Sequence, residues 1–156
     1  MNLFNDEYYM RKALMQAEIA FNAGEVPIGA IAVKDDLVIA KAHNQVEMLQ
    51  DPTAHAEILL ITQVAASLKN WRLEDVDIYV TKEPCAMCAG AMVNARVRKV
   101  IIGLADPRSG GAGGGLDITG FAGMLHNVEV KNGVLEEECK SLIQSFFQKA
   151  RLKNKN

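Results

Sequence analysis

Two short segments of the sequence carry side chains that can bind a metal ion and move a proton. His55 and Glu57 lie two residues apart in TAHAEILL, and Cys85 and Cys88 lie three residues apart in EPCAMC. An imidazole and two thiolates together suit Zn²⁺. Because three protein ligands leave the fourth coordination position to water, this combination predicts a catalytic zinc site.

The spacing within each segment supports a division of roles. Residues three apart share one face of a helix, so the sulfurs of Cys85 and Cys88 can reach the same ion. We expect both cysteines in the first turn of a helix, where unpaired N–H groups favour thiolate. His55 and Glu57 are separated by about 200° of rotation in an ideal helix. We therefore expect His55 to bind the metal and Glu57 to flank the activated water and pass its proton to a leaving amine.

Each motif also has other interpretations. A Cys-x-x-Cys pair alone could be a redox dithiol, half of a structural zinc site, or core packing. A redox dithiol leaves the upstream histidine unexplained, and a structural site would need a fourth ligand. Cys139, the remaining cysteine, is expected to pack in the core. His43 and His126 have no partner at ligand spacing, so surface or structural roles are expected for both.

Composition describes an ordinary globular chain. Its 156 residues are 49% hydrophobic and 23% charged, and we expect one domain over residues 1–156. We find no secretory signal and no apolar run near the roughly 20 residues of a membrane span. Three cysteines argue against a disulfide framework, so we expect a cytoplasmic protein without a membrane segment.

The net charge of −2 argues against general coating of nucleic acid, although residues 149–156 hold four basic residues and no acid. Such a tail is more often a solvated end than a binding arm.

Hydrophobic periodicity predicts the elements that position these residues. Helices are expected over 6–21, 51–69, 84–95 and 135–152, and strands over 28–34, 37–43, 75–81, 98–104 and 127–133. Asp51 or Thr53 is expected to cap the second helix. In the last helix we expect these residues to face inward: Leu135, Cys139, Leu142, Ile143 and Phe146. The alternation of strands and helices predicts an α/β fold with a mixed sheet covered on both faces.

One segment does not fit this pattern. Seven of the twelve glycines lie between Gly110 and Gly123, in GGAGGGLDITGFAG. A loop of this length without regular structure is uncommon inside a domain and is usually functional or mobile. A flexible surface excursion and a substrate-gating loop both remain open interpretations.

The metal motifs resemble the H-x-E and P-C-x-x-C signature of zinc-dependent nucleoside and nucleobase deaminases. Further segments resemble bacterial tRNA adenosine deaminases of the TadA type, in the family's order and over nearly the whole chain: EVPIGAIAV (25–33), DPTAHAEI (51–58), YVTKEPCAMCAGAMVNAR (79–96), GLADPRSGGAG (103–113) and SFFQKAR (145–151). The resemblance implies a single zinc-dependent deaminase domain folded as a cytidine-deaminase-like three-layer α/β/α sandwich with a five-stranded mixed sheet. It also implies a homodimer that converts the wobble adenosine, position 34 of a tRNA anticodon, to inosine.

The resemblance also assigns roles by matching position. One Zn²⁺ per chain would be bound by His55, Cys85 and Cys88, and Glu57 would shuttle protons. The substrate-binding positions would be Asn44 at the extruded nucleoside, Pro27, Ile28, Gly29 and Ala56 around the pocket, Asp106 and Arg108 beside the neighbouring nucleotides, and Phe147 and Arg151 against the anticodon loop. The implied partner is the anticodon stem-loop of a tRNA, with arginine tRNA as the expected example. Asp106 could equally cap a turn, Arg108 could be solvated and Phe147 could belong to the core.

The chain departs from the family pattern in GGLDITGFAG, where relatives commonly carry a serine-leucine-methionine run and a histidine pair. Dimer contacts and flanking-base preference are therefore open. Two other functions also remain open: deamination of a free base or nucleoside such as guanine or cytosine, and a non-catalytic zinc-folded subunit of an RNA-modifying complex. The basic tail and FFQKAR favour an RNA substrate, and Glu57 favours catalysis.

Overall fold

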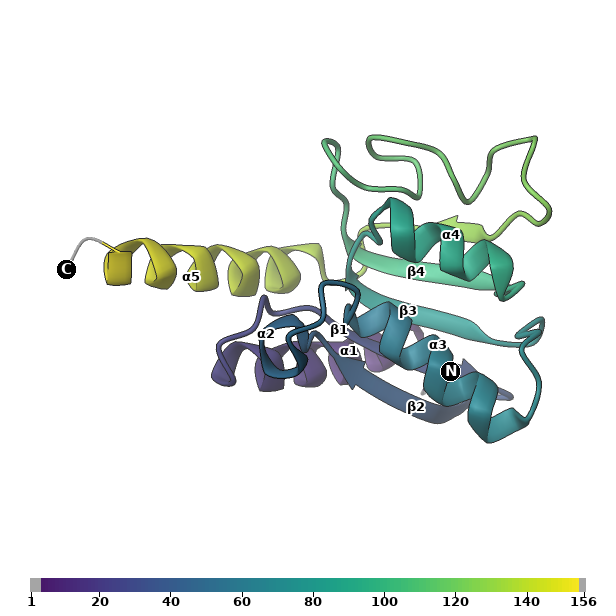
Figure 1. The fold of residues 1–156 in the computed structure, drawn as a ribbon, viewed down its shortest axis with the longest axis horizontal. Coiled ribbons are helices and arrows are strands. Elements are labelled where there is room, and N and C mark those ends of the chain that lie inside the picture. Colours follow the sequence, from purple (N-terminus) through teal and green to yellow (C-terminus); the bar gives the residue numbers. More distant parts are fainter. Residues whose placement is uncertain (1–3, 155–156) are drawn as a thin grey trace.

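The computed structural model describes residues 4–154 and contains one five-stranded sheet with helices on both sides (Figure 1). The strands are β1 (Gly29–Lys34), β2 (Leu37–His43), β3 (Asp77–Lys82), β4 (Lys99–Leu104) and β5 (Glu129–Lys131). The helices are α1 (Asp6–Asn22), α2 (Val46–Leu49), α3 (Ala56–Leu68), α4 (Ala86–Asn94) and α5 (Glu136–Asn154). The strand order is β2-β1-β3-β4-β5. β1 is antiparallel to β2 and β3, whereas β3, β4 and β5 are parallel, so the predicted mixed sheet is confirmed.

The sheet separates two hydrophobic cores. Ala30 of β1 belongs to a core that includes Leu60 of α3 and Met92 of α4. Its neighbour Ile31 belongs to a second core with Met10 of α1. Successive side chains of a strand point to opposite faces of a sheet, which explains why adjacent residues join different cores. The predicted three-layer sandwich is therefore confirmed, with α3 and α4 on one face and α1 and the start of α5 on the other.

Helix α5 begins on the sheet and ends beyond it. Cys139 is its one fully buried residue in the part of the chain that the structure describes. Leu142 and Ile143, which were expected to face inward, are only partly buried. The helix extends past the edge of the sheet (Figure 1), so its later turns have few neighbours to cover them. Phe146 still makes an edge contact with Phe21 of α1, with ring centroids 6.0 Å apart.

Two helix starts differ from the sequence-based predictions. The prediction that Asp51 or Thr53 caps the second helix is wrong, because α3 begins at Ala56 with His55 as its N-cap residue. Asp51 instead closes a turn, in which its Oδ1 accepts hydrogen bonds from the backbone N–H and the hydroxyl of Thr53 at 2.8 Å each. Likewise, α4 begins at Ala86, so Cys85 is its N-cap residue.

The short helix α2 was not predicted from the sequence. The buried carboxylate of Glu25 accepts hydrogen bonds from the backbone N–H groups of Glu47 and Met48, at 2.9 and 2.8 Å. These N–H groups have no partner inside a helix, so the carboxylate stabilises the helix start. A contact between residues more than 20 positions apart leaves no local signal in the sequence.

The glycine-rich segment 110–123 contains no helix or strand, as expected, but backbone hydrogen bonds and two isolated bridges tie it down. Within residues 4–154, every helix is too short or too polar to cross a membrane.

Candidate metal centre and active site

His55, Cys85 and Cys88 meet at one point although they come from two helices. Their ligand atoms all lie within 4.8 Å of one another. Nδ1 of His55 is 3.6 Å from Sγ of Cys85 and 3.4 Å from Sγ of Cys88. A tetrahedral Zn²⁺ with Zn–N near 2.1 Å and Zn–S near 2.3 Å separates nitrogen and sulfur ligands by about 3.6 Å. The three residues therefore form a candidate metal site whose donor atoms and spacing fit Zn²⁺.

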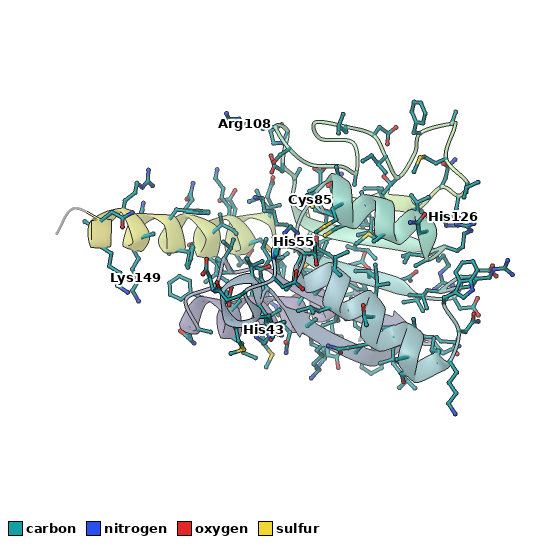
Figure 2. All side chains as sticks on the ribbon, viewed as in Figure 1. His43, His55, Cys85, Arg108, His126 and Lys149 are labelled. Carbon is teal, nitrogen blue, oxygen red and sulfur yellow. The ribbon has the colours of Figure 1, made fainter. Side chains whose placement is uncertain are left out.

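The N-termini of α3 and α4 converge on this site. His55 is the N-cap residue of α3, Cys85 is the N-cap residue of α4, and Cys88 lies in the first turn of α4. Figure 2 shows His55 and Cys85 next to each other between the two helices. Because helix N-termini carry partial positive charge, both favour thiolate ligands here.

The two thiols differ in acidity. The hydrogen bond from the Cys88 thiol lowers the pKa of Cys85 to about 5, with help from nearby backbone N–H groups. The same hydrogen bond, together with burial, raises the pKa of Cys88. One thiol thus ionises readily, while the second resists because it would lose its hydrogen bond to Cys85 and leave a buried charge. A divalent cation between the two sulfurs would compensate that charge, since cysteine binds metal as thiolate.

Glu57 lies one residue into α3, beside the metal ligands. Its side chain is only 3% exposed, and burial raises the pKa of its carboxyl. Its Oε1 has no hydrogen-bond partner within residues 4–154. A buried carboxylate oxygen without a partner is costly, and such groups cluster at functional sites. Its position suits a proton acceptor that meets its partner only when substrate is bound.

A pocket of about 450 Å³ opens beside the metal ligands. Ligand pockets of roughly 300–1,000 Å³ accept small organic molecules. Its lining includes these residues: Gly24, Glu25, Val26, Ile28, Asn44, Val46, Glu47, His55, Lys82, Phe146 and Phe147. Segments from α1–β1, β2–α2, α3, β3 and α5 therefore enclose one cavity with His55 in its wall.

The pocket brings together some of the predicted substrate-binding residues. Asn44 is 6% exposed, and its backbone N–H donates to the carbonyl oxygen of Ile28 at 3.0 Å. This hydrogen bond holds Asn44 and Ile28 together in the pocket wall. Phe147 lines the pocket from α5 and is 44% exposed, so it does not belong to the core.

Other predicted residues lie around the pocket rather than in its lining. Pro27 is buried and directly precedes the lining residue Ile28, and Ala56 is buried as the first residue of α3. A Cβ added to Gly29 would lie 2.1 Å from the carbonyl oxygen of Ala13, so this glycine faces α1 on the opposite side of the sheet.

The predicted RNA-contacting residues lie farther out. Asp106 caps a turn through the N–H groups of Arg108 and Ser109 and lies 3.5 Å from Nζ of Lys82. The Ser109 hydroxyl also donates to Oδ2 of Asp106 at 2.7 Å, and this hydrogen bond, with the two from N–H groups, lowers the pKa of Asp106 to about 2. Arg108 is exposed on the loop after β4 (Figure 2), and Arg151 is exposed near the end of α5.

The remaining histidines lie away from the metal site (Figure 2). Nε2 of His126 lies 2.8 Å from the carbonyl oxygen of Val97, which is a structural role. His43 ends β2 and is partly buried. Sequence reasoning missed Lys82, although the charge directly before the EPC segment could have drawn attention to it.

The fold and the site together define a deaminase. The sequence matches the family model of MafB19-like deaminases over residues 4–151, so the chain belongs to this family. The tRNA-specific adenosine deaminase of Bacillus subtilis (strain 168) is 46% identical over 150 residues, which cover 96% of this chain and 93% of that protein. A structure from a study of A-to-I editing by tRNA:A34 deaminases is 39% identical, with a TM-score of 0.83, covering 86% of this chain and 98% of that chain. A guanine deaminase structure from Bacillus subtilis is 36% identical with a TM-score of 0.63, covering 73% of this chain and 71% of that chain.

Proposed function

We propose that this chain is a tRNA-specific adenosine deaminase that converts the wobble adenosine, position 34 of the anticodon, to inosine. The observation that carries the proposal is Oε1 of Glu57, which has no hydrogen-bond partner among the described residues and lies beside the candidate ligands His55, Cys85 and Cys88. The relative from Bacillus subtilis and the tRNA:A34 deaminase structure support adenosine in tRNA as the substrate.

One Zn²⁺ per chain would be held by His55, Cys85 and Cys88. When bound, it lowers the pKa of water and so supplies a nucleophile at neutral pH. The carboxylate of Glu57 takes the proton of the attacking water and delivers it to the amino group at C6 of adenine. A C–O bond forms at C6, the C–N bond breaks, and ammonia leaves. Burial of Glu57 supports this role, because a raised pKa helps a carboxyl to return the proton.

The pocket would take the extruded adenosine. Asn44 supplies an amide for hydrogen bonds, and Ile28 and Phe147 supply apolar walls. Pro27, Gly29 and Ala56 would hold this wall from behind. Extrusion costs a few kcal/mol and less where the base is already unstacked, as in an anticodon loop.

The RNA on either side of the adenosine would contact two basic regions. Arg108 projects from the loop after β4, and Lys149, Arg151 and Lys153 are exposed on the last turns of α5. Figure 2 shows Arg108 and Lys149 on different sides of the His55 region. Lys155 of the predicted basic tail lies outside the described residues. Phosphate contacts of this kind position an RNA without reading its sequence.

We further propose that the chain works as a homodimer in the cytoplasm. Exposed apolar side chains on α4, on the glycine-rich segment and just after that segment support an interface: Met87, Leu116, Phe121 and Leu125. The three unpaired cysteines suit a reducing compartment. Sedimentation velocity at micromolar concentration tests the dimer, and a monomer would contradict it.

The second candidate is a guanine deaminase, which the 36% identical structure favours. The basic turns of α5 count against it, since a free base makes no use of them. The experiment incubates the purified chain with the anticodon stem-loop of an arginine tRNA, beside free adenosine, cytidine and guanine. We expect inosine in the stem-loop alone. Release of ammonia from guanine, with an unchanged stem-loop, would replace the first proposal with the second.

A further inference from the structure

Glu83 is a buried carboxylate directly before the metal-ligand turn, and it takes no part in the metal site. It is 5% exposed. Its Oε1 accepts a hydrogen bond from the backbone N–H of Asp106 at 2.9 Å. Its Oε2 accepts hydrogen bonds from the N–H groups of Ala112 at 3.0 Å and Gly114 at 2.9 Å. Three backbone N–H groups of one loop therefore converge on a single side chain that lies far from them in the sequence.

The glycines of this loop fit closely around that carboxylate. A Cβ added to Gly110 would lie 2.1 Å from Oε2 of Glu83. A Cβ added to Gly114 would lie 2.7 Å from both carboxylate oxygens and 2.0 Å from the carbonyl oxygen of Asp106. Any side chain at either position would push the loop away from Glu83. Close approach of the backbone thus explains two of the glycines that the sequence alone left unexplained.

The loop that Glu83 holds contacts the metal-ligand turn and one residue of the pocket lining. The N–H of Gly111 donates to the carbonyl oxygen of Pro84 at 2.7 Å, and Gly110 forms an isolated bridge with Cys85. Asp106, at the other end of the loop, lies 3.5 Å from Nζ of Lys82, which lines the pocket. Loop 106–114 therefore lies against the metal-ligand turn and against Lys82 in the pocket wall, and Glu83 is its central anchor.

We propose that Glu83 is a positioning residue that fixes loop 106–114 as the rim of the pocket and so sets how the nucleotides beside the target adenosine are received. It acts through the backbone N–H groups of Asp106, Ala112 and Gly114 and does not touch the substrate. The inference rests on the proposed function, because it assigns the rim to the flanking nucleotides of an RNA.

The test compares Glu83→Gln with Gly114→Ala, using the wild-type chain and an anticodon stem-loop as substrate. A glutamine side chain turns its NH₂ group toward at least one of the three N–H donors, so one or two hydrogen bonds disappear. Gly114→Ala keeps the carboxylate and displaces the loop sterically. Because removing buried hydrogen bonds of this kind weakens the rim rather than the chemistry, we expect KM to rise about tenfold with kcat within about threefold in both variants. Discrimination among stem-loops that differ at the nucleotides beside the adenosine should also weaken, while metal content stays at the wild-type level.

Asp117→Asn is the matched control. It makes the same carboxylate-to-amide change in the glycine-rich segment, but within residues 4–154 the Asp117 carboxylate accepts only the local N–H of Gly120, at 3.0 Å. KM should not change in this variant.

Unchanged KM and unchanged flanking-base discrimination in both test variants would overturn the inference. So would loss of metal or folding in both, because Glu83 would then act on stability alone. An inactive wild-type chain would count against the proposed function instead. In that case, amide hydrogen exchange still decides whether Glu83 anchors the loop: Glu83→Gln must speed exchange at Asp106, Ala112 and Gly114 above the rest of the chain.

Discussion

Nδ1 of His55 lies 3.4 Å from Sγ of Cys88, although 33 positions separate the two residues. The N-termini of α3 and α4 meet at this point, on the same face of the sheet. The proposed chemistry depends on this contact, because neither helix alone supplies all three candidate metal ligands.

Replacing His55 by Ala should abolish tight metal binding. With one of three ligands gone, the purified variant should hold far less than one zinc per chain by elemental analysis. Its melting temperature should equal that of wild-type protein stripped by a chelator, since bound metal stabilises the folded state. His43→Ala, which changes a histidine outside the site, should keep its zinc. Full zinc occupancy in His55→Ala would disprove the ligand assignment.

Replacing Glu57 by Gln should separate metal binding from catalysis. The variant should keep wild-type zinc content, and its kcat should fall by about 10²–10⁴-fold because an amide cannot carry the proton. Single-turnover assays of inosine formation measure the loss. Glu74→Gln, an exposed change, serves as the control. An active Glu57→Gln enzyme would show that another group moves the proton.

Removing charge from the end of α5 should weaken RNA binding and its salt dependence. The double variant with Lys149→Gln and Arg151→Gln should bind the stem-loop less tightly, and the slope of log K against log salt should shrink by roughly 0.7 for each RNA phosphate that is no longer neutralised. The same double change at Lys34 and Lys41, in the β1–β2 hairpin, removes equal charge elsewhere. If both pairs shift the slope equally, the end of α5 has no special role in binding.

Two glycine substitutions should change stability in opposite directions. A Cβ on Gly103 of β4 would lie 2.4 Å from Sγ of Cys139 and 2.8 Å from the carbonyl oxygen of Thr81. Gly103→Ala should therefore lower the free energy of unfolding by about 1–3 kcal/mol.

Gly90, inside α4, has no neighbour within 4 Å of such a Cβ. Gly90→Ala should raise the free energy of unfolding by about 0.5–1 kcal/mol, because alanine favours a helix. Urea titration of the metal-loaded proteins measures both changes, and an unstable Gly90→Ala would contradict the packing around α4.

Cys139 should make stability depend on pH in the alkaline range. Burial raises the pKa of its thiol from the ordinary 9.0 to about 12. The folded state therefore holds this proton more tightly than the unfolded state. The resulting stabilisation is complete below pH 9 and is lost as the pH rises through 12. The urea midpoint of the wild-type chain should fall more steeply between about pH 8 and pH 10.5 than that of Cys139→Ala. Parallel slopes would mean that Cys139 titrates like an exposed thiol.

Local patterns in the sequence predicted most of the elements correctly. Alternating and helical hydrophobic periods identified the strands, α1, α4 and α5, because these periods follow from which side chains must face a core. The start of α3 was placed too early because DPT looks like a capping segment, and only the packed structure shows that it closes a separate turn. The overestimate of burial along α5 has a similar reason, since periodicity cannot tell where the sheet beneath a helix ends.

The candidate metal ligands could be read from the sequence, because ligand types and their spacing within a helical turn are local properties. The contacts between segments could not. The link between Glu25 and α2, the link between Glu83 and loop 106–114, and the presence of Lys82 and Phe147 at one pocket all join residues distant along the chain. Such contacts form only when the sheet and its two helical layers have packed, so the residues that can do chemistry are a property of the sequence, and the shape of the pocket around them is a property of the fold.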